Sequence, residues 1–416
     1  MKLRSLRAFR HRNFRLFFCG QSTSLIGTWI QLIAMSWLVY RLTGSAWLLG
    51  VTGFAMQIPI LLLAPFAGTL ADRFDRRKLL LGVQVAMFLQ AAALAVLDWS
   101  GAIQVWHVIV LALLGGVINA ADTPLRQSLM PELVSGREDL TAVVAFSAFM
   151  QNAGRLIGPT LAGVLLAFWS EAACFAINAA SKLAVIGAVV ALTLAPRPPR
   201  KGGSSVLDDI REGVAYAWNL VPIRILLPVL ACVSFMATPY QTLMPIVAAE
   251  VFGGGADTLG FLIGAAGFGG TTTVLWLAGR RSVRGLPRIM AGGAAAAGTA
   301  LIAFAFCPWY FPALALLFIA GGGIMTVITS TSQILQTIVD DDKRGRVMSI
   351  YTMSFLGMIP LGALAAGAAA EVIGALYTMA AGGACCLVAA AILVTRFPTL
   401  RTHLTPIYER LGVGRN

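Results

Sequence analysis

Long runs of apolar residues, separated by short polar breaks, follow one another along the whole chain. A helix that crosses a bilayer needs about 20 apolar residues, and about twelve segments reach this length. They are residues 16–40, 47–71, 79–97, 106–128, 141–168, 173–195, 225–249, 258–279, 289–306, 311–336, 347–370 and 374–395. The longest polar interval, 196–222, leaves no room for a soluble domain. The pattern therefore predicts an all-α integral membrane protein.

The predicted spans divide into two groups of six. Residues 1–195 are expected to form an N-terminal six-helix bundle, and residues 223–416 a C-terminal six-helix bundle with a polar tail. Residues 196–222 join them as a Pro/Gly-rich basic linker that ends in a short amphipathic helix. Pro159 in the fifth span and Pro360 in the eleventh lie in similar glycine-rich surroundings, about half the chain apart. This echo predicts a pseudo-symmetric pair of bundles.

Charge is scarce and unevenly placed. Only 12% of the residues are charged, yet the net charge is +13. All but three of the 31 Lys and Arg residues fall in alternate loops or at the two ends of the chain, the exceptions being Arg41, Arg155 and Lys182. The positive-inside rule then predicts that both termini are cytoplasmic. A nucleic-acid partner is not expected, because no folded soluble domain gathers the charge.

Polar side chains recur at helical spacing on the first and fourth spans of each predicted bundle. Because polar groups in a span face protein or water, these stripes are predicted to line one substrate cavity. The alternative is that each stripe is an interhelical hydrogen-bonding seam. The candidate cavity residues are Gln21, Ser24, Thr28, Gln31, Asn119, Thr123, Ser234, Thr238, Gln241, Thr326, Ser330 and Gln333.

Few charged residues fall inside the predicted spans. Asp122 and Arg126 are four residues apart and can pair on one helix, and Arg155 lies in the next span. Asp122 is the only carboxylate well inside a span, which makes it a candidate for proton coupling. The alternative is a permanently ionised structural partner of Arg126 or Arg155. Lys182 is expected in a packing seam with Asn178 and receives no role.

The densest charge lies in Gly68–Lys78, with the sequence GTLADRFDRRK, between the second and third spans. Charges in hydrocarbon are costly, so this stretch is expected to form a loop at the membrane surface. Its pattern resembles the signature loop of the major facilitator superfamily of secondary transporters. The resemblance implies that Asp72 contacts the N-terminus of the eleventh span, near residues 345–347, and that this contact holds the two halves together as a latch. The residues assigned to this latch are Gly68, Asp72, Arg73, Arg76, Arg77 and Arg346.

Further segments resemble the branch that contains the enterobactin exporter and macrolide and drug effluxers. They are DTPLRQ at 122–127, PELV at 131–134 and NAGRLIGP at 152–159. Gly158, Pro159 and Gly163 resemble an element found in drug:proton antiporters. The resemblance implies a proton-coupled exporter of amphipathic or apolar small molecules that works by alternating access in the bacterial inner membrane. It is expected to be a monomer in the lipid bilayer, with small-molecule substrates and protons as partners.

Three other functions remain open at this point: a flippase or exporter of lysophospholipid-like molecules, a receptor or scaffold that transports nothing, and a membrane-embedded enzyme. The last is not expected, because no nucleophile–base pair or nucleotide-binding loop occurs in the spans. His11 and His403 lie outside the spans and His107 lies at the outer end of one, so the three cannot cluster and neither a metal site nor a cofactor is predicted.

Overall fold

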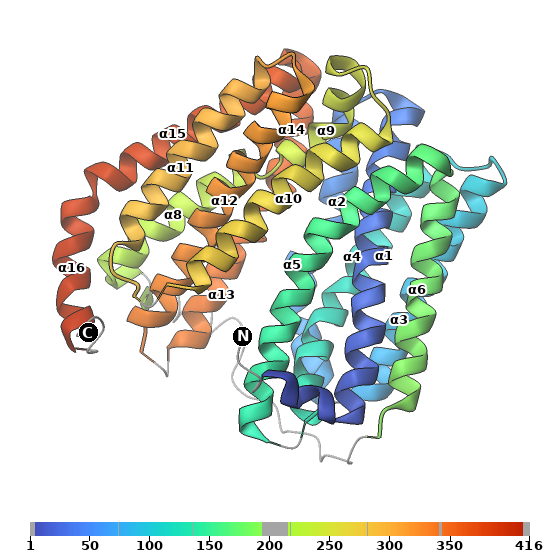
Figure 1. The fold of residues 1–416 in the computed structure, drawn as a ribbon, viewed down its shortest axis with the longest axis horizontal. Coiled ribbons are helices and arrows are strands. Elements are labelled where there is room, and N and C mark those ends of the chain that lie inside the picture. Colours follow the sequence, from blue (N-terminus) through green and yellow to red (C-terminus); the bar gives the residue numbers. More distant parts are fainter. Residues whose placement is uncertain are drawn as a thin grey trace. The chain divides into compact units, whose positions relative to one another are not determined.

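The computed structural model describes residues 5–73, 75–134, 136–193, 215–216, 218–280, 282–340 and 343–410. These residues form helices joined by short turns (Figure 1). Eleven helical stretches among them are long and apolar enough to cross a membrane. The predicted fifth span lies in α5 (Arg137–Phe168), a helix of 32 residues. The all-α membrane fold predicted from the apolar pattern is thereby confirmed.

The helices form two compact units that interleave along the chain. Unit 1 comprises residues 1–44, 55–203 and 254–264, and unit 2 comprises residues 45–54, 204–253 and 265–416. Two helices contribute to both units, namely α2 (Ala46–Arg73) and α10 (Ala256–Ala278). The predicted bundle boundaries stay a prediction, and most of the predicted linker with its amphipathic helix lies outside the described residues.

Unit 1 is built on α1 (Arg12–Thr43), α3 (Arg76–Trp99), α4 (Val105–Leu129), α5 and α6 (Glu171–Ala191). Short 3₁₀ turns precede α1 at Ser5–Arg10 and follow α4 at Met130–Glu132. Its apolar core joins α1, α3, α4, α5 and α6 through buried side chains such as Phe14, Leu80, Leu129 and Val185. At the other end of these helices, Arg41 pairs with Glu171 at 2.7 Å and with Asp98 at 3.6 Å.

Glycine brings α1 and α6 unusually close together. A Cβ atom added to Gly27 would overlap the Ser181 hydroxyl and approach the Asn178 carboxamide to 2.9 Å. Small residues allow such close contact between membrane helices, where the hydrophobic effect does not drive association. The close approach also lets the polar side chains of α6 reach the backbone and hydroxyls of α1.

Unit 2 is built on α8 (Val221–Met236), α9 (Tyr240–Ile246), α11 (Leu286–Ala305), α12 (Tyr310–Ile338), α13 (Arg344–Phe355), α14 (Met358–Ile373), α15 (Ala375–Thr395) and α16 (Phe397–Arg410). A π-helical turn, Val247–Val251, follows α9. Its core lies where α11 packs on α12 and α15. The last helix, α16, turns the buried side chains of Leu400, Leu404 and Tyr408 toward the unit.

Two spans predicted as continuous are broken. The predicted span 225–249 stops at Met236 and resumes at Tyr240, because Pro239 supplies no backbone N–H to continue the ladder. The predicted span 347–370 divides at Leu356–Gly357, between α13 and α14. There Pro360 cannot donate to the Leu356 carbonyl four residues before it. Apolar composition gives no sign of either break.

The charged stretch Gly68–Lys78 is mainly helical, where a loop had been predicted. α2 continues to Arg73, and α3 begins at Arg76. The carboxylate of Asp75 accepts hydrogen bonds from the backbone N–H groups of Arg77 at 3.0 Å and Lys78 at 3.2 Å. Asp75 is therefore an N-cap that starts α3, and the connection between the two helices is very short.

Candidate functional site

A buried lysine occupies the contact between α1 and α6. The Lys182 ammonium donates to the hydroxyl of Ser24 at 2.8 Å and to the hydroxyl of Thr28 at 2.7 Å. Lys182 is 4% exposed, and no carboxylate of the described residues lies within ion-pair distance of it. A buried ammonium is costly unless it is paired with an opposite charge, so this cation is held by neutral oxygens alone.

Thr28 connects this lysine to the surface. Ser24 is buried, whereas Thr28 is exposed. The Thr28 hydroxyl accepts a hydrogen bond from Lys182 and donates one to the Ser24 carbonyl at 2.8 Å. A proton that leaves the ammonium therefore has an exposed hydroxyl one hydrogen bond away.

An ion pair lies close to the lysine on α4. The Asp122 carboxylate is 2.7 Å from Nε of Arg126 and accepts a hydrogen bond from the Gln84 carboxamide at 2.6 Å. Asp122 is 4% exposed, and the charges of Asp122 and Arg126 both act on Lys182. The Arg126 guanidinium and the Gln84 carboxamide thus fix the position of the Asp122 carboxylate. These three ionised side chains would together carry one net positive charge.

A second set of hydrogen bonds, between carboxamides, begins at Asn178, one turn of α6 from the lysine. Asn178 donates to the Gln31 side-chain oxygen at 2.6 Å, and Gln31 donates to Gln90 at 3.1 Å. Gln90 then donates to the Leu111 carbonyl of α4 at 3.0 Å. The interior of unit 1 thus holds a polar network that spans α1, α3, α4 and α6.

The predicted stripe on α1 lies within this network. Ser24, Thr28 and Gln31 bond to α6 or α3, and Gln21 is buried, with an Oε1 atom that has no partner among the described residues. These contacts match the alternative interpretation of an interhelical seam. Thr28, being exposed, is the member of the stripe best placed to line a pathway, and the cavity assignment stays a prediction.

The predicted stripe on α4 divides between two environments. Asp122 is buried inside unit 1, Asn119 is half-buried, and Thr123 is exposed. The four polar residues at positions 119, 122, 123 and 126 span about 100° of the helix. One edge of the stripe therefore faces the interior of unit 1, and the other faces its surface. Asn119 and Thr123 are therefore available to a pathway, while Asp122 and Arg126 serve the buried network.

The stripes of unit 2 contain buried hydroxyls that the protein leaves unpaired. In the described part of the chain, the side chains of Ser234, Thr238 and Ser330 have no hydrogen-bond partner. Gln241 donates to the Tyr240 hydroxyl at 3.3 Å, and the Thr326 hydroxyl donates to the Gly322 carbonyl at 2.8 Å. Gln333 is half-buried. Buried polar groups are normally paired with protein or water, so the three unpaired hydroxyls can accept a partner from outside the chain.

The glycine–proline element of α5 has a packing role. Gly158 lets α5 approach Trp29 of α1, because a Cβ at this position would overlap the Trp29 side chain. The Arg155 guanidinium lies 5.9 Å from the centre of the Trp29 ring, within the range of a cation–π interaction. Pro159 lies inside α5, and Gly163 packs against Gly260 of the α10 segment that belongs to unit 1.

Two predicted latch residues make contacts inside unit 1. Arg76 donates to the Ser128 carbonyl at 3.2 Å and to the Glu132 carboxylate at 3.3 Å. Arg77 donates to the Val189 carbonyl at 3.1 Å. Both arginines therefore stabilise the carboxyl ends of helices, where the dipole favours cations. The side chains of Gly68, Asp72 and Arg73 lie outside the described residues, and Arg346 belongs to α13 of unit 2.

Sequence reasoning gave Lys182 no role and did not consider Gln84. The signal for Lys182 was present, because Asn178, Ser181 and Lys182 are spaced three and four residues apart and share one face of α6. Gln84 is an isolated polar residue in α3, so only the structure brings it to Asp122.

The chain is similar to known transporters over nearly its whole length. A family model described as "Transmembrane secretion effector" matches residues 4–406. The staphyloferrin A transporter of Staphylococcus aureus is 30% identical over 383 residues, which cover 89% of this chain and 92% of that protein. The multidrug efflux pump Tap of Mycolicibacterium fortuitum is 27% identical, covering 85% of this chain and 88% of the pump.

Solved structures support the fold. The nucleoside transporter NupG aligns with a TM-score of 0.70 at 13% identity, over 93% of this chain and 99% of that one. A bacterial homologue of the human lysosomal transporter Spinster aligns with a TM-score of 0.69 at 13% identity, over 97% of this chain and 98% of that one. The chain therefore belongs to the transmembrane secretion effector family, in the drug- and siderophore-efflux branch of the major facilitator superfamily.

Proposed function

We propose that this protein is a secondary active exporter of amphipathic or apolar small organic molecules, drug-like or siderophore-like, driven by protons through alternating access. The observation that carries the proposal is the likeness, over most of its length, to proteins named for staphyloferrin A transport and multidrug efflux. In this proposal the protein works as a monomer in the bacterial inner membrane, with both termini in the cytoplasm.

The polar residues that are available to a substrate fit this class of molecule. They are hydroxyls and carboxamides that are exposed or half-buried: Thr28, Asn119 and Thr123 in unit 1, and Thr238, Gln241 and Gln333 in unit 2. Such groups can orient a ligand with a few hydrogen bonds without demanding a fixed charge. Hydroxyls and carboxamides also suit a substrate with a large apolar part better than an inorganic ion, which needs several charged ligands.

Proton coupling is assigned to the buried charges of unit 1. Asp122 was the candidate acid, and its carboxylate is held by Arg126 and Gln84. Lys182 has only neutral oxygens around its ammonium. A buried charge that touches only neutral oxygens is costly, and among these three side chains of the described residues Lys182 is the one held in that way. We therefore assign proton binding to Lys182 and the role of fixed counter-charge to Asp122.

Thr28 supplies the route for the proton in this proposal. Its hydroxyl touches the Lys182 ammonium, and its side chain is exposed. Protonation of Lys182 adds a positive charge next to the Asp122–Arg126 pair. The polar contacts between α1, α4 and α6 then differ between the two protonation states, as coupling requires.

Transport by the purified protein in proteoliposomes tests the function. The probes are a macrolide and staphyloferrin A, each offered with and without an imposed pH gradient, and a fluorescent lysophospholipid serves as a third probe. We expect accumulation of the macrolide or the siderophore that depends on the gradient. Accumulation that is independent of the pH gradient would exclude proton coupling. Transport of the lysophospholipid alone would indicate a flippase rather than an exporter of drugs or siderophores.

A further inference from the structure

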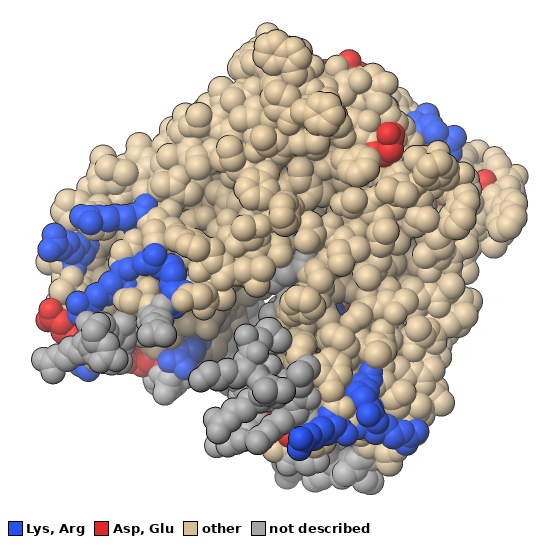
Figure 2. Space-filling model, in the orientation of Figure 1, with Lys and Arg blue, Asp and Glu red and all other residues tan. Residues whose placement is uncertain are grey.

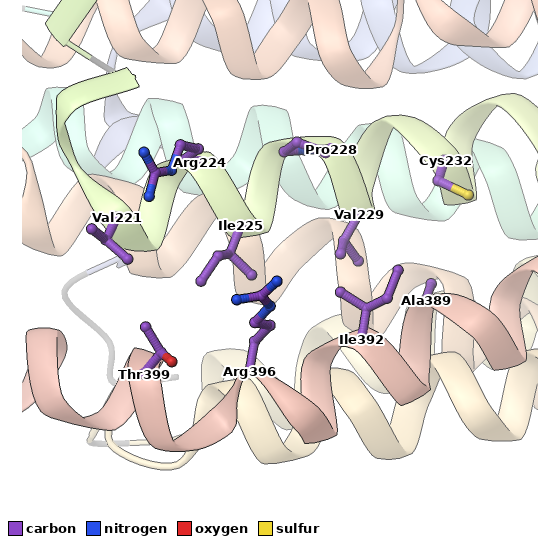
Figure 3. A pocket seen from close by; sticks show the side chains of 10 residues that line it. All are labelled: Val221, Arg224, Ile225, Pro228, Val229, Cys232, Ala389, Ile392, Arg396 and Thr399. Atoms are coloured by element: carbon purple, nitrogen blue, oxygen red, sulfur yellow. The ribbon is translucent and has the colours of Figure 1, made fainter.

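A narrow groove with an apolar floor lies on unit 2, where α8, α15 and the start of α16 meet (Figure 3). Its volume is about 350 Å³. The walls are apolar over most of their length, with Ile225 and Val229 on α8 and Ile392 on α15. Arg224 and Arg396 also line it. An apolar groove lined by two arginines suits an occupant with an apolar part and a negative charge.

The two arginines lie at the same level of the unit because the helices that carry them run in opposite directions. Arg224 is in the first turn of α8, and Arg396 follows the last residue of α15. Both are exposed, and neither makes an ion pair or a side-chain hydrogen bond with any other described residue. Two such arginines can hold a phosphate group between them, because guanidinium groups match the geometry of phosphate oxygens.

The apolar part of the groove runs away from this charged level. From Arg224 to Cys232 along α8 is eight residues, or about 12 Å of helix. This reach is more than a third of the ~30 Å hydrocarbon core of a bilayer. Next to the groove, Val388 is 57% exposed and Ile392 is 43% exposed. Exposed aliphatic side chains on a span face lipid tails, so the groove opens toward the acyl-chain region.

The same end of unit 2 is rich in basic residues. Arg288 lies over the Phe397 ring at 4.5 Å, and Arg401 lines a neighbouring depression on α16. Figure 2 shows Lys and Arg gathered where α16 lies, while the tan surface of the unit above them is free of charged residues on the face seen. By the positive-inside rule this end lies at the cytoplasmic surface, where anionic lipid headgroups attract basic residues.

We propose that this groove binds one anionic phospholipid of the cytoplasmic leaflet. The phosphodiester lies between Arg224 and Arg396, and one acyl chain follows the apolar wall formed by α8 and α15. A soluble anion would use the two arginines but not the apolar channel, and a zwitterionic lipid would bring a cation next to them. The depth of the groove and its charge therefore both select an anionic lipid.

Native mass spectrometry of the full-length protein in detergent tests the site. The protein is titrated with phosphatidylglycerol, with phosphatidylcholine or with inorganic phosphate. The test variant is Arg224→Gln/Arg396→Gln. Its matched control is Arg12→Gln/Arg15→Gln, which removes the same charge from two exposed arginines of unit 1. A third variant, Ile225→Trp, fills the groove and leaves both arginines in place.

We expect the parent and the control to retain one phosphatidylglycerol that the test variant binds about 10- to 30-fold more weakly. Ile225→Trp should also lose this lipid, and phosphatidylcholine should bind all variants alike. Equal retention of phosphatidylglycerol by the test variant and the control would overturn the site. Retention of phosphatidylglycerol by Ile225→Trp as strong as by the parent would overturn the acyl-chain part. Proton-driven transport enters none of these measurements, so they stand apart from the proposed function.

Discussion

Nζ of Lys182 lies 2.7 Å from Oγ1 of Thr28, and this bond joins a buried cation to an exposed side chain. The lysine belongs to α6 and the threonine to α1, so the bond also crosses the contact at which Gly27 brings the two helices together. Any change in the protonation of Lys182 is felt directly at this helix contact. This bond is one of several polar contacts that join α1 to α6, beside the bond between Asn178 and Gln31.

Lys182→Met should abolish the effect of a pH gradient on transport while the protein still folds. The methionine keeps most of the volume of the lysine stem and removes a cation that has no carboxylate partner among the described residues. Because replacing a buried charge with an apolar residue of similar size is often neutral or stabilising, the unfolding temperature should not fall. Transport in proteoliposomes with and without a gradient provides the measurement, and thermal unfolding in detergent the control. A variant that still responds fully to the gradient would exclude Lys182 as the proton-binding group.

Asp122→Asn should destabilise unit 1. The substitution removes the counter-charge of Arg126 and leaves two cations in unit 1, Arg126 and the buried Lys182, whose charges act on each other. Breaking a buried pair by removing one partner costs about 3 kcal/mol or more. Thermal unfolding should therefore move to lower temperature.

A double-variant cycle separates this charge effect from lost packing. In Asp122→Asn/Lys182→Met one of the two cations is gone, so part of the lost stability should return. Unfolding temperatures of the four proteins in one detergent give the coupling between the two sites. Strictly additive effects would contradict an electrostatic connection between Asp122 and Lys182.

Gly27→Ala should loosen the contact between α1 and α6. The new methyl group would overlap the Ser181 hydroxyl, and overpacking of this kind costs about 1–3 kcal/mol. Gly187→Ala is the matched control on α6, since nothing lies within 4 Å of a Cβ placed there. That control should be neutral or stabilising, because Ala is the better helix former. Equal unfolding temperatures for the two variants would show that the close approach is absent.

Much of the fold followed from simple physical rules. A run of about 20 apolar residues predicts a membrane span, and every predicted span overlaps a helix of the structure. The break before Tyr240 was missed, because the whole stretch Val221–Val251 is long and apolar enough to be taken for one span. Only the missing N–H of Pro239 signals the break, and proline is tolerated inside many membrane helices.

The candidate site could be predicted only in part. Helical spacing correctly put Asp122 next to Arg126. Spacing could not tell which helix each stripe faces, since this depends on how far the helices rotate as they pack. Asp122 and Thr123 are adjacent in sequence but lie in opposite environments. Lys182 was left without a role because its partners on α1 are more than 150 residues away along the chain.

Asp72→Asn tests the latch that the family resemblance implies. We expect it to lower transport by shifting the balance between conformations, with little effect on the unfolding temperature. Arg77→Gln is the comparison, because Arg77 bonds to the carboxyl end of α6 inside unit 1. It should lower the unfolding temperature by the loss of about 1–2 kcal/mol. Unchanged transport by a folded Asp72→Asn protein would exclude the latch hypothesis.

Tyr408 should make the docking of α16 sensitive to high pH. Burial raises the pKa of this phenol to about 12, and its hydroxyl has no partner within the described part of the chain. The unfolded phenol titrates near pH 10, so unfolding is favoured increasingly as the pH rises from about 10 to 12. The stability that Tyr408 contributes is complete below pH 10 and declines above it.

Tyr408→Phe has no ionisable group and leaves no hydroxyl unpaired, so it should match or exceed the parent at pH 7 and lose less stability at pH 11. Chemical unfolding followed at both pH values gives the comparison, and parallel losses in the two proteins would mean that Tyr408 is not buried against unit 2.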